Sequence, residues 1–340
     1  MPEMSIAEAL RQAIREEMAR DPRVFCIGED IGIEGGFGGA FTVTLGLSQE
    51  FGHDRILDTP ISEAGLAGVA IGAAMAGLRP IADVQYGDFL FCAMDQIANQ
   101  AAKMTYMSGG TVRVPMVMRV PVGATRRGAQ HAQSLEAFFT HIPGLKVVAP
   151  STAYDAKGLL KSAVRDDNPV LVFEHKLLYG SKGPRSEKGA LSPIGEVPDE
   201  EYLVPIGKGI VRREGRDVTI VGKLLTMYRA LEAAEELAAK GIEAEVIDPR
   251  SLVPLDKELI LESVRKTGRL VIVEEDNLTG GWAADISAIV AEEAFFWLDA
   301  PIKRVSAPDT PAPFAPVMEE FYVPSVQQVV EAVEYTMGEG

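Results

Sequence analysis

The chain has 340 residues, 47% of them hydrophobic, which is enough apolar material for two packed domains. Its net charge is −16 and its Lys and Arg residues are scattered, so it lacks the basic face that a nucleic-acid-binding protein needs. No apolar run is long enough to cross a membrane, and the charged amphipathic N-terminus is not typical of a signal or transit peptide, so we expect a cytoplasmic protein that binds no membrane.

Short apolar strands alternate with helical stretches in the first half of the chain. Ser5 can cap a helix that runs to Arg20, and the stretch from Ser62 to Gly77, rich in Gly and Ala, predicts another helix. We expect strands over 24–28, 55–58, 79–85, 114–120, 145–149 and 169–175, and further helices over 88–107, 132–141 and 152–165. Strands separated by helices favour a mostly parallel sheet with helices on both faces.

The composition changes between Ser181 and Pro205, where Pro, Gly and charged residues replace periodic apolar positions and predict a linker. A second α/β region follows. Its expected strands are 218–221, 244–248, 270–274 and 302–305, and its expected helices are 227–240, 257–267, 283–295 and the segment after Ser325. The sequence therefore predicts an α/β protein with a parallel-sheet domain over residues 1–185, a linker over 186–205 and a second α/β domain over 206–340.

Long motifs in a fixed order connect this sequence to a known family. They are TPISEAGLAGVAIGAAMAGLRPIADVQ, GAQHAQSLEAFFTHIPGLKVVAPSTAYDAKGLL and RDDNPVLVFEHKLLYG, followed by VRKTGRLVIVEED and RVSAPDTPAPFAP. The chain resembles the beta subunits of thiamine-diphosphate-dependent 2-oxo acid dehydrogenases (E1), the family of pyruvate, branched-chain 2-oxo acid and acetoin dehydrogenases. The resemblance implies a pyrimidine-binding domain for thiamine diphosphate, followed by a domain like the transketolase C-terminal domain.

Glu63 is the candidate catalytic acid. It stands in TPISEAG, at the turn between a strand and a helix, with apolar Ile61 and Leu66 nearby. Thiamine diphosphate reacts after a carboxylate hydrogen-bonds its aminopyrimidine ring, and the resemblance assigns this contact to Glu63. It also implies that Phe89 stacks on the ring, Gln85 lies beside it and Ile61 presses on the bent cofactor. Spacing alone favours a first-turn carboxylate stabilised by the helix dipole, and plain core packing for the other residues.

The histidines are not spaced as metal ligands: His53, His131, His141 and His175. Only His131 follows a glycine-bearing loop from which a side chain can face a cleft. The resemblance implies that His131 lines the substrate end of the site and assists acyl transfer to the lipoyl group, for which an imidazole is suited. We expect the other histidines to be structural, and the two cysteines, Cys26 and Cys92, to be buried reduced thiols.

Two further features follow from the resemblance alone. Glu29 and Asp95 match residues that join the catalytic acid in a proton tunnel between active sites, but Cys92 stands where certain members have an acid, so exposed or capped carboxylates are an equal alternative. Family members often hold a structural K⁺ ion, mostly through main-chain carbonyls. The matching positions are Val114, Met116, Val117, Ala163, Asp166 and Asn168.

The sequence contains no motif for the cofactor's phosphates. There is no GDG turn followed by Asn and no P-loop, and the loop GIEGGFGGAF lacks GxGxxG spacing. The resemblance implies that an E1 alpha subunit holds Mg²⁺ and the diphosphate in an alpha2beta2 heterotetramer, and that the E2 lipoyl acyltransferase core is a further partner. The glycine-rich helix 62–77 then faces a subunit interface, with packing on its own sheet as the alternative.

The sequence thus predicts an E1 beta subunit that helps to decarboxylate a 2-oxo acid, first of all pyruvate, and to transfer the acyl group to lipoyl-E2. Acetoin and branched-chain 2-oxo acids stay open as substrates because much of the substrate pocket would belong to the alpha chain. A complete transketolase-like enzyme would need a phosphate-binding domain in the same chain. A purely structural subunit is the remaining alternative, and under it Glu63 would be dispensable.

Overall fold

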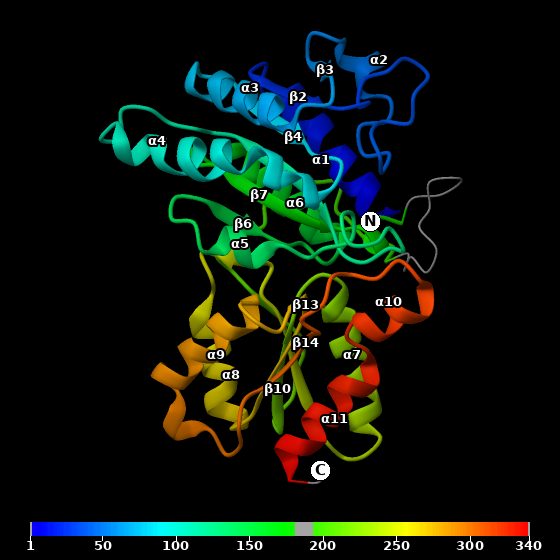
Figure 1. Cartoon of the computed structure of the whole chain (residues 1–340), viewed down its shortest axis with the longest axis vertical. Helices are drawn as coiled ribbons and strands as arrows, with labels where there is room; N and C mark the ends of the chain where they lie inside the picture. Colours follow the sequence, from blue (N-terminus) through cyan, green and yellow to red (C-terminus); the bar gives the residue numbers. More distant parts are fainter. Residues whose placement is uncertain (1, 181–192, 339–340) are drawn as a thin grey trace.

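Two α/β domains lie one above the other in the computed structural model, which describes residues 2–180 and 193–338 (Figure 1). The strands of the N-terminal sheet run in the order β12-β6-β7-β5-β4-β2-β3. Those from the first half of the chain are mutually parallel: β2 (Val24–Gly28), β3 (Ile56–Asp58), β4 (Arg79–Asp83), β5 (Val117–Val122), β6 (Lys146–Val148) and β7 (Val170–His175). The predicted parallel sheet is confirmed.

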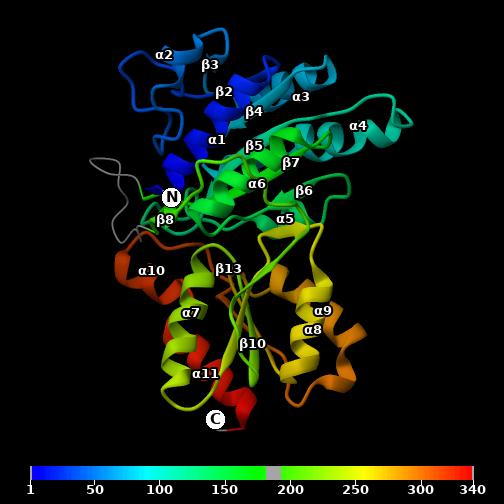
Figure 2. The same ribbon diagram turned by 180° about the vertical axis from the view of Figure 1, so that it is seen from behind.

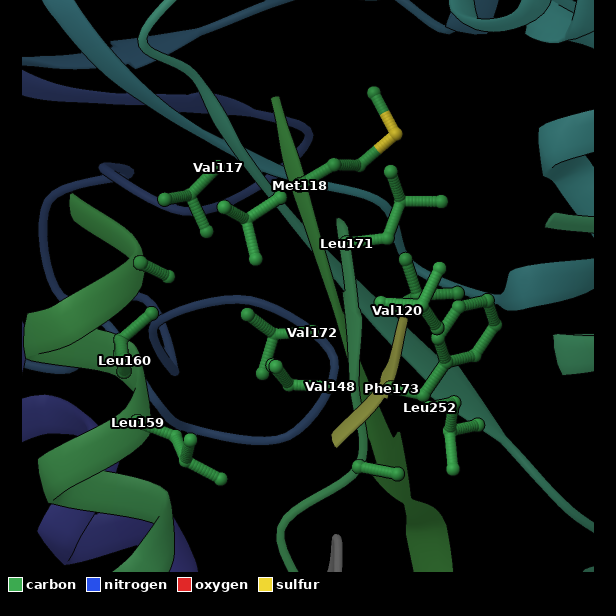
Figure 3. Close-up of a cluster of buried hydrophobic side chains, with 14 of the residues drawn as sticks. Val117, Met118, Val120, Val148, Leu159, Leu160, Leu171, Val172, Phe173 and Leu252 are labelled. Carbon is green, nitrogen blue, oxygen red and sulfur yellow. The ribbon is translucent and has the colours of Figure 1, made fainter. Parts of the chain in front are cut away.

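This sheet is buried on both faces, which is why its strands are continuous apolar runs without alternation. Side chains of β5 and β7 point alternately to the two sides (Figure 3). Val117 and Val172 face Leu159 and Leu160 of helix α6 (Ala153–Arg165), whereas Leu171 and its neighbours face away from that helix. The strand positions therefore follow from the burial of both faces.

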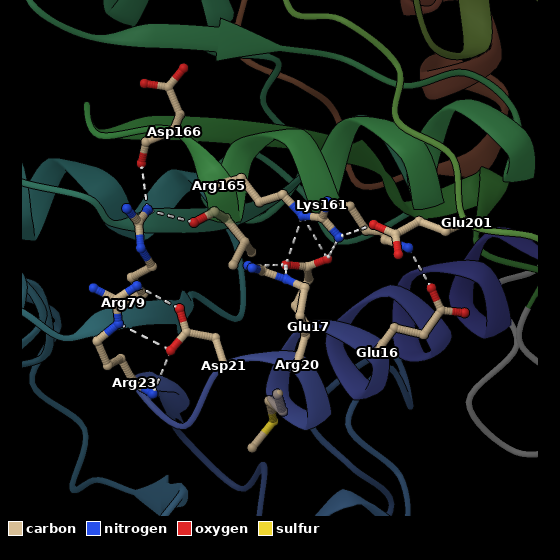
Figure 4. A network of polar contacts seen from close by, with 12 residues as sticks. Glu16, Glu17, Arg20, Asp21, Arg23, Arg79, Lys161, Arg165, Asp166 and Glu201 are labelled. Atoms are coloured by element: carbon tan, nitrogen blue, oxygen red, sulfur yellow. Dashed lines mark hydrogen bonds and ion pairs between the residues drawn. The ribbon is translucent and has the colours of Figure 1, made fainter.

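Helices cover the N-terminal sheet: α1 (Ile6–Arg20), α2 (Leu47–Phe51), α3 (Glu63–Met75), α4 (Ala102–Met107), α5 (Glu136–Thr140) and α6. Ser5 caps α1 in a capping box with Glu8, and Thr152 caps α6, where the sequence predicted helix starts. Helices α1 and α6 are joined by ion pairs such as Lys161–Glu16 at 2.6 Å (Figure 4).

The helix expected over 88–107 differs in form. The segment starts as a 3₁₀ helix, Gly87–Ala93, and passes through a π-helical stretch, Gln96–Ala101, before α4. Of the helix expected over 132–141, only residues Glu136–Thr140 (α5) are helical in the structure. Gln133 connects the two segments. Its backbone N–H and its side-chain amide donate to the Asp88 carboxylate, at 3.3 Å and 2.7 Å, and so hold the starts of the two segments together. Cys92 is exposed on the first segment, so the expectation of a buried thiol is confirmed only for Cys26.

The C-terminal sheet has the order β14-β13-β10-β11-β9. Its strands are β9 (Ile210–Arg213), β10 (Val218–Gly222), β11 (Ala244–Asp248), β13 (Leu270–Asn277) and β14 (Lys303–Ala307). Figure 2 shows helices on either side of it: α7 (Leu225–Ala238) and α11 (Val326–Met337) on one, α8 (Lys257–Thr267) and α9 (Trp282–Glu293) on the other. The second α/β domain is confirmed; the sequence missed the edge strand β9 and the short helix α10 (Pro316–Tyr322).

The two domains share secondary structure across the expected boundaries. Strand β12 (Ser251–Val253) comes from the second half of the chain but pairs antiparallel with β6 in the N-terminal sheet. Within the expected linker, β8 (Gly195–Glu196) pairs with β1 (Glu3–Met4), while linker residues 186–192 lie outside the described part. Buried apolar residues of both domains belong to one continuous cluster. In the described ranges, no helix is long and apolar enough to traverse a lipid bilayer.

Candidate functional site

The carboxyl ends of the parallel strands meet at one edge of the N-terminal sheet. Glu29 follows β2, Glu63 starts α3 after β3, Gln85 and Phe89 follow β4, and His131 lies in the loop after β5. In open parallel sheets, ligands bind outside this edge because the loops there surround one crevice. The fold therefore gathers these predicted site residues at the edge where a binding site is expected.

A buried ion network holds the strand ends rigid beneath these loops. Arg119 of β5 is 2% exposed and pairs with Asp83 at the end of β4 and with Glu174 of β7 at 2.6 Å. The Tyr179 hydroxyl donates to Glu174 at 2.6 Å. Because each charge in this network has a partner, the strands that present Gln85 and the loop after β5 are fixed relative to one another.

Glu29 and Glu63 form an acidic pair after β2 and β3, the last two strands in the sheet order. Glu29 is buried, and burial raises its pKa above the ordinary value, with a further increase from the negative charges of Glu63 and Asp30. The backbone N–H of Ser62 donates to the Glu29 carboxylate, and the Gln85 amide donates to the Glu29 carbonyl at 3.4 Å. Glu29 therefore releases its proton less readily than an ordinary glutamate does.

Asp95 occupies a different environment. It is exposed at the start of the π-helical segment, and its carboxylate accepts hydrogen bonds from Asn99 at 2.8 Å and Gln96 at 3.4 Å. The structure thus pairs Glu29 with Glu63 by charge, and holds Asp95 in a local hydrogen-bonded turn. A tunnel through all these acids stays a prediction.

An aromatic group begins at Tyr86, the residue after Gln85. The Phe89 and His131 rings meet edge to face, with centroids 5.3 Å apart, and Tyr86 contacts both, at 5.6 Å from Phe89 and 5.1 Å from His131. Phe89 and His131 are only partly buried, so part of each ring is accessible. Sequence reasoning missed Tyr86, although it stands directly between Gln85 and the GDF motif. Lys176 was also not identified from the sequence. Its ammonium lies over the Tyr86 ring at 4.9 Å and donates to the His131 carbonyl.

The surroundings of Glu63 are only half covered by this chain. Of its two apolar neighbours, Leu66 is buried but Ile61 is 82% exposed, so this chain alone does not enclose the acid in apolar side chains. Glu63 itself is partly exposed. A large aliphatic side chain left bare beside an acid leaves room for an apolar group from elsewhere. An acid, an exposed aliphatic side chain and the partly accessible Phe89 ring at the same edge of the sheet fit an aromatic cofactor ring.

The outer face of α3 is also bare. Its buried residues are Leu66, Ala67, Ala70, Ile71 and Ala74, so the helix packs on its own sheet through aliphatic side chains. Gly65, Val69 and Gly72 are exposed on the other side, and a Cβ placed on Gly72 would meet no atom within 4 Å. The chain's own packing therefore does not require glycine at position 72, and an apolar helix with a bare face is typical of a covered interface.

The residues expected to bind K⁺ lie at the opposite edge of the sheet, around the start of β5 and from the last turn of α6 to the start of β7. The two segments are adjacent because the Met116 carbonyl accepts from the Val170 N–H at 2.9 Å. Arg79 donates to the carbonyls of Val164 and Asp166, each at 2.9 Å (Figure 4), and Lys146 pairs with the Asp166 carboxylate. Arg79 and Lys146 therefore already bind oxygen atoms in this region, and the potassium site stays a prediction.

Comparison with known proteins places this geometry in a family. The description "transketolase, pyrimidine binding domain" matches residues 2–182, and "transketolase, C-terminal domain" matches residues 207–329. The 2-oxoisovalerate dehydrogenase subunit beta of Bacillus subtilis is 48% identical over 335 residues, which cover 98% of each chain. The chain belongs to the E1 beta family. Its domain order and transketolase-like α/β fold agree with the resemblance seen in the sequence.

Other E1 beta relatives carry different substrate names. The acetoin:2,6-dichlorophenolindophenol oxidoreductase subunit beta of Cupriavidus necator is 49% identical over 345 residues, covering 99% of this chain and 98% of that protein. The mitochondrial pyruvate dehydrogenase E1 component subunit beta-1 of Arabidopsis thaliana is 47% identical over 331 residues, covering 97% and 88%. A solved "split gene transketolase, inactive beta4 tetramer" has a TM-score of 0.78 at 26% identity and covers 99% of both chains.

The remaining histidines occupy contrasting places in this E1 beta chain. His53 and His141 are exposed, whereas His175 at the end of β7 is 3% exposed and bonded to Glu275 of β13 at 2.8 Å. The expected structural role suits His175, which joins the two domains. Its partner Glu275 was missed because it lies 100 positions away in the sequence, and no local pattern pairs such residues.

Proposed function

We propose that the chain is the beta subunit of an E1 component that oxidatively decarboxylates a 2-oxo acid and passes the acyl group to lipoyl-E2, and that it is active only in an alpha2beta2 heterotetramer. The observation that carries this proposal is the partial exposure of Glu63. Its charge acts on buried Glu29, and it stands beside the exposed Ile61 at the edge where the parallel strands end. The transketolase neighbour supports it, since a tetramer of that protein's beta chains is inactive.

Each site residue has a role in the proposed mechanism. Thiamine diphosphate, when bound, supplies the carbanion chemistry that cleaves the bond next to the keto group. Glu63 would hold a proton against the aminopyrimidine ring, with Glu29, whose pKa is raised, as its neighbour. Phe89 and Ile61 would contact the ring faces, and His131 would move a proton during acyl transfer at the substrate end. We assign Mg²⁺ and the diphosphate to the alpha subunit.

The substrate is proposed to be pyruvate, with acetoin and branched-chain 2-oxo acids as specific alternatives. Relatives named for each of these activities are 47% to 49% identical to this chain. Such similar sequence identities do not rank the substrates. The proposed roles of the site residues concern the cofactor and the acyl-transfer step, which the three reactions share. Turnover of the three substrates by the assembled complex would decide among them.

The test of the proposed function is Glu63→Gln in the assembled complex. We expect substrate turnover to fall about 10²- to 10⁴-fold while the tetramer stays intact, because the amide cannot exchange a proton with the ring. The matched control is Glu50→Gln on α2, where the carboxylate pairs with Arg15 at the surface and turnover should not change. Undiminished turnover in Glu63→Gln would instead support a purely structural subunit.

A further inference from the structure

The loop that carries His131 is held by the C-terminal domain. Glu275, in β13, accepts a hydrogen bond from the Ala124 N–H at 2.5 Å through one carboxylate oxygen and contacts His175 Nε2 at 2.8 Å through the other. Ala124 follows Gly123, where the loop leaves β5 with a φ of +93°. A Cβ on Gly123 would lie 2.1 Å from His175 Nε2, so the imidazole is packed directly against this turn.

Lys176, the residue that follows β7, continues the connection to the site. The Lys176 ammonium donates to the backbone carbonyl of His131 itself. A second anchor comes from α10, where Glu319 accepts from the Arg126 N–H at 2.5 Å. Residues 123–131 are thus attached at their start, middle and end by buried side chains, and both carboxylates come from the C-terminal domain.

The charge state of Glu275 suits this role. Burial opposes its ionisation, but the charge of His175 and hydrogen bonds from His175 and the Ala124 N–H outweigh burial and hold the pKa of Glu275 below its ordinary value. Glu275 is 4% exposed, His175 3% and Lys176 1%. A charged hydrogen-bond acceptor that is excluded from water binds its donors tightly. Removal of the Glu275 carboxylate would therefore leave the Ala124 N–H and His175 Nε2 without a buried partner.

We propose that Glu275 is a positioning residue for His131: through Ala124, His175 and Lys176 it fixes the 123–131 loop, so that acyl transfer to the lipoyl group depends on a side chain of the C-terminal domain. The inference rests on the proposed function of His131. It gives the C-terminal domain, to which none of the site residues predicted from the sequence belongs, a part in one specific step of the reaction.

The experiment compares two electron acceptors in the assembled complex. Glu275→Ala should lower turnover with a lipoyl domain about tenfold to a hundredfold, because a displaced loop misplaces His131. Reduction of 2,6-dichlorophenolindophenol, which needs no acyl transfer, should change no more than about twofold. His131→Ala should give the same pattern. Glu275→Gln should recover lipoyl turnover to within about threefold of the wild type, because its amide oxygen can still accept from Ala124.

Asp155→Ala is the matched control. Asp155 is equally buried and also joins the domains, through Arg250 at 3.0 Å, but it does not contact the 123–131 loop. It should leave the ratio of the two activities unchanged. Lys176→Met, which removes the donor to the His131 carbonyl, carries the same test if Glu275→Ala does not assemble. An equal loss of both activities, or no loss, in the Glu275 and Lys176 variants overturns the inference. An active Glu63→Gln complex would overturn the proposed function instead.

Discussion

Glu274 is a buried carboxyl group in the middle of β13, and its ionisation opposes folding. It is fully buried and accepts hydrogen bonds from the Ala283 N–H at 2.7 Å and the Ser306 hydroxyl at 2.9 Å. Burial, followed by the negative charge of Asp276, raises the pKa of Glu274 to about 8. The group therefore couples stability to pH near neutrality.

The sign of this coupling follows from the two pKa values. Between the ordinary value of 4.5 and about 8, the folded chain holds the proton and the unfolded chain does not. Stability is therefore fully present below the lower value and is lost as pH rises through the upper one, by at most about 1.4 kcal/mol per pH unit. Glu274→Gln should flatten the fall of Tm between pH 4.5 and about 8 in calorimetry. A curve that parallels the wild type, as we expect for the exposed Glu293→Gln, would contradict this assignment.

The candidate site was predictable where a residue is marked by its own motif. Glu63 in TPISEAG, Phe89 in GDFLF and His131 in GAQHAQ were identified by resemblance, and the structure brings them to one edge of the sheet. Lys176 and Glu275 were not predictable, because their significance comes only from contacts made across the folded chain. The exposure of Ile61 was likewise invisible to a pattern that identifies apolar residues but not what covers them.

Helix α3 provides a prediction at the scale of an element. Gly72→Leu should not destabilise the isolated chain and should stabilise the helix by roughly 0.5–1 kcal/mol, because the added side chain meets open space and glycine is a poor helix former. If a partner helix covers this face, the same change should weaken assembly with the alpha subunit about tenfold to a hundredfold by overpacking. Analytical ultracentrifugation measures the assembly. Glu235→Leu on the exposed face of α7 is the control, and equal assembly by both variants would refute an interface at α3.

Long elements with strong periodicity or caps were predicted well, and short or irregular ones were not. The bounds of α1 and α6 follow from Ser5 and Thr152, whose side chains cap them. Strand β9 was missed because half of its residues are arginines on a sheet edge, and α10 because prolines and turn residues surround it. These elements exist because the rest of the fold packs against them, which local propensity does not encode.

At the scale of the whole molecule, β12 makes the two domains depend on each other. It completes the N-terminal sheet with Leu252, which is 3% exposed beside Phe173 (Figure 3). A polypeptide of residues 1–205 should therefore melt at least about 5 °C below the intact chain, since it lacks this buried contact and the shared apolar cluster. The intact chain should give one calorimetric transition. Two separate transitions, with the shorter polypeptide matching the first, would show that the domains are independent.

The same strand has a consequence for biosynthesis. A ribosome releases the N-terminal domain before it has made Ser251–Val253, and domains generally fold as they emerge. During that interval β6 is the outermost strand of the sheet, with one row of N–H and C=O groups unpaired. Such an edge pairs readily with other extended chains. The nascent polypeptide is therefore most prone to aggregation between completion of β7 and arrival of β12, the period in which a chaperone would protect it most.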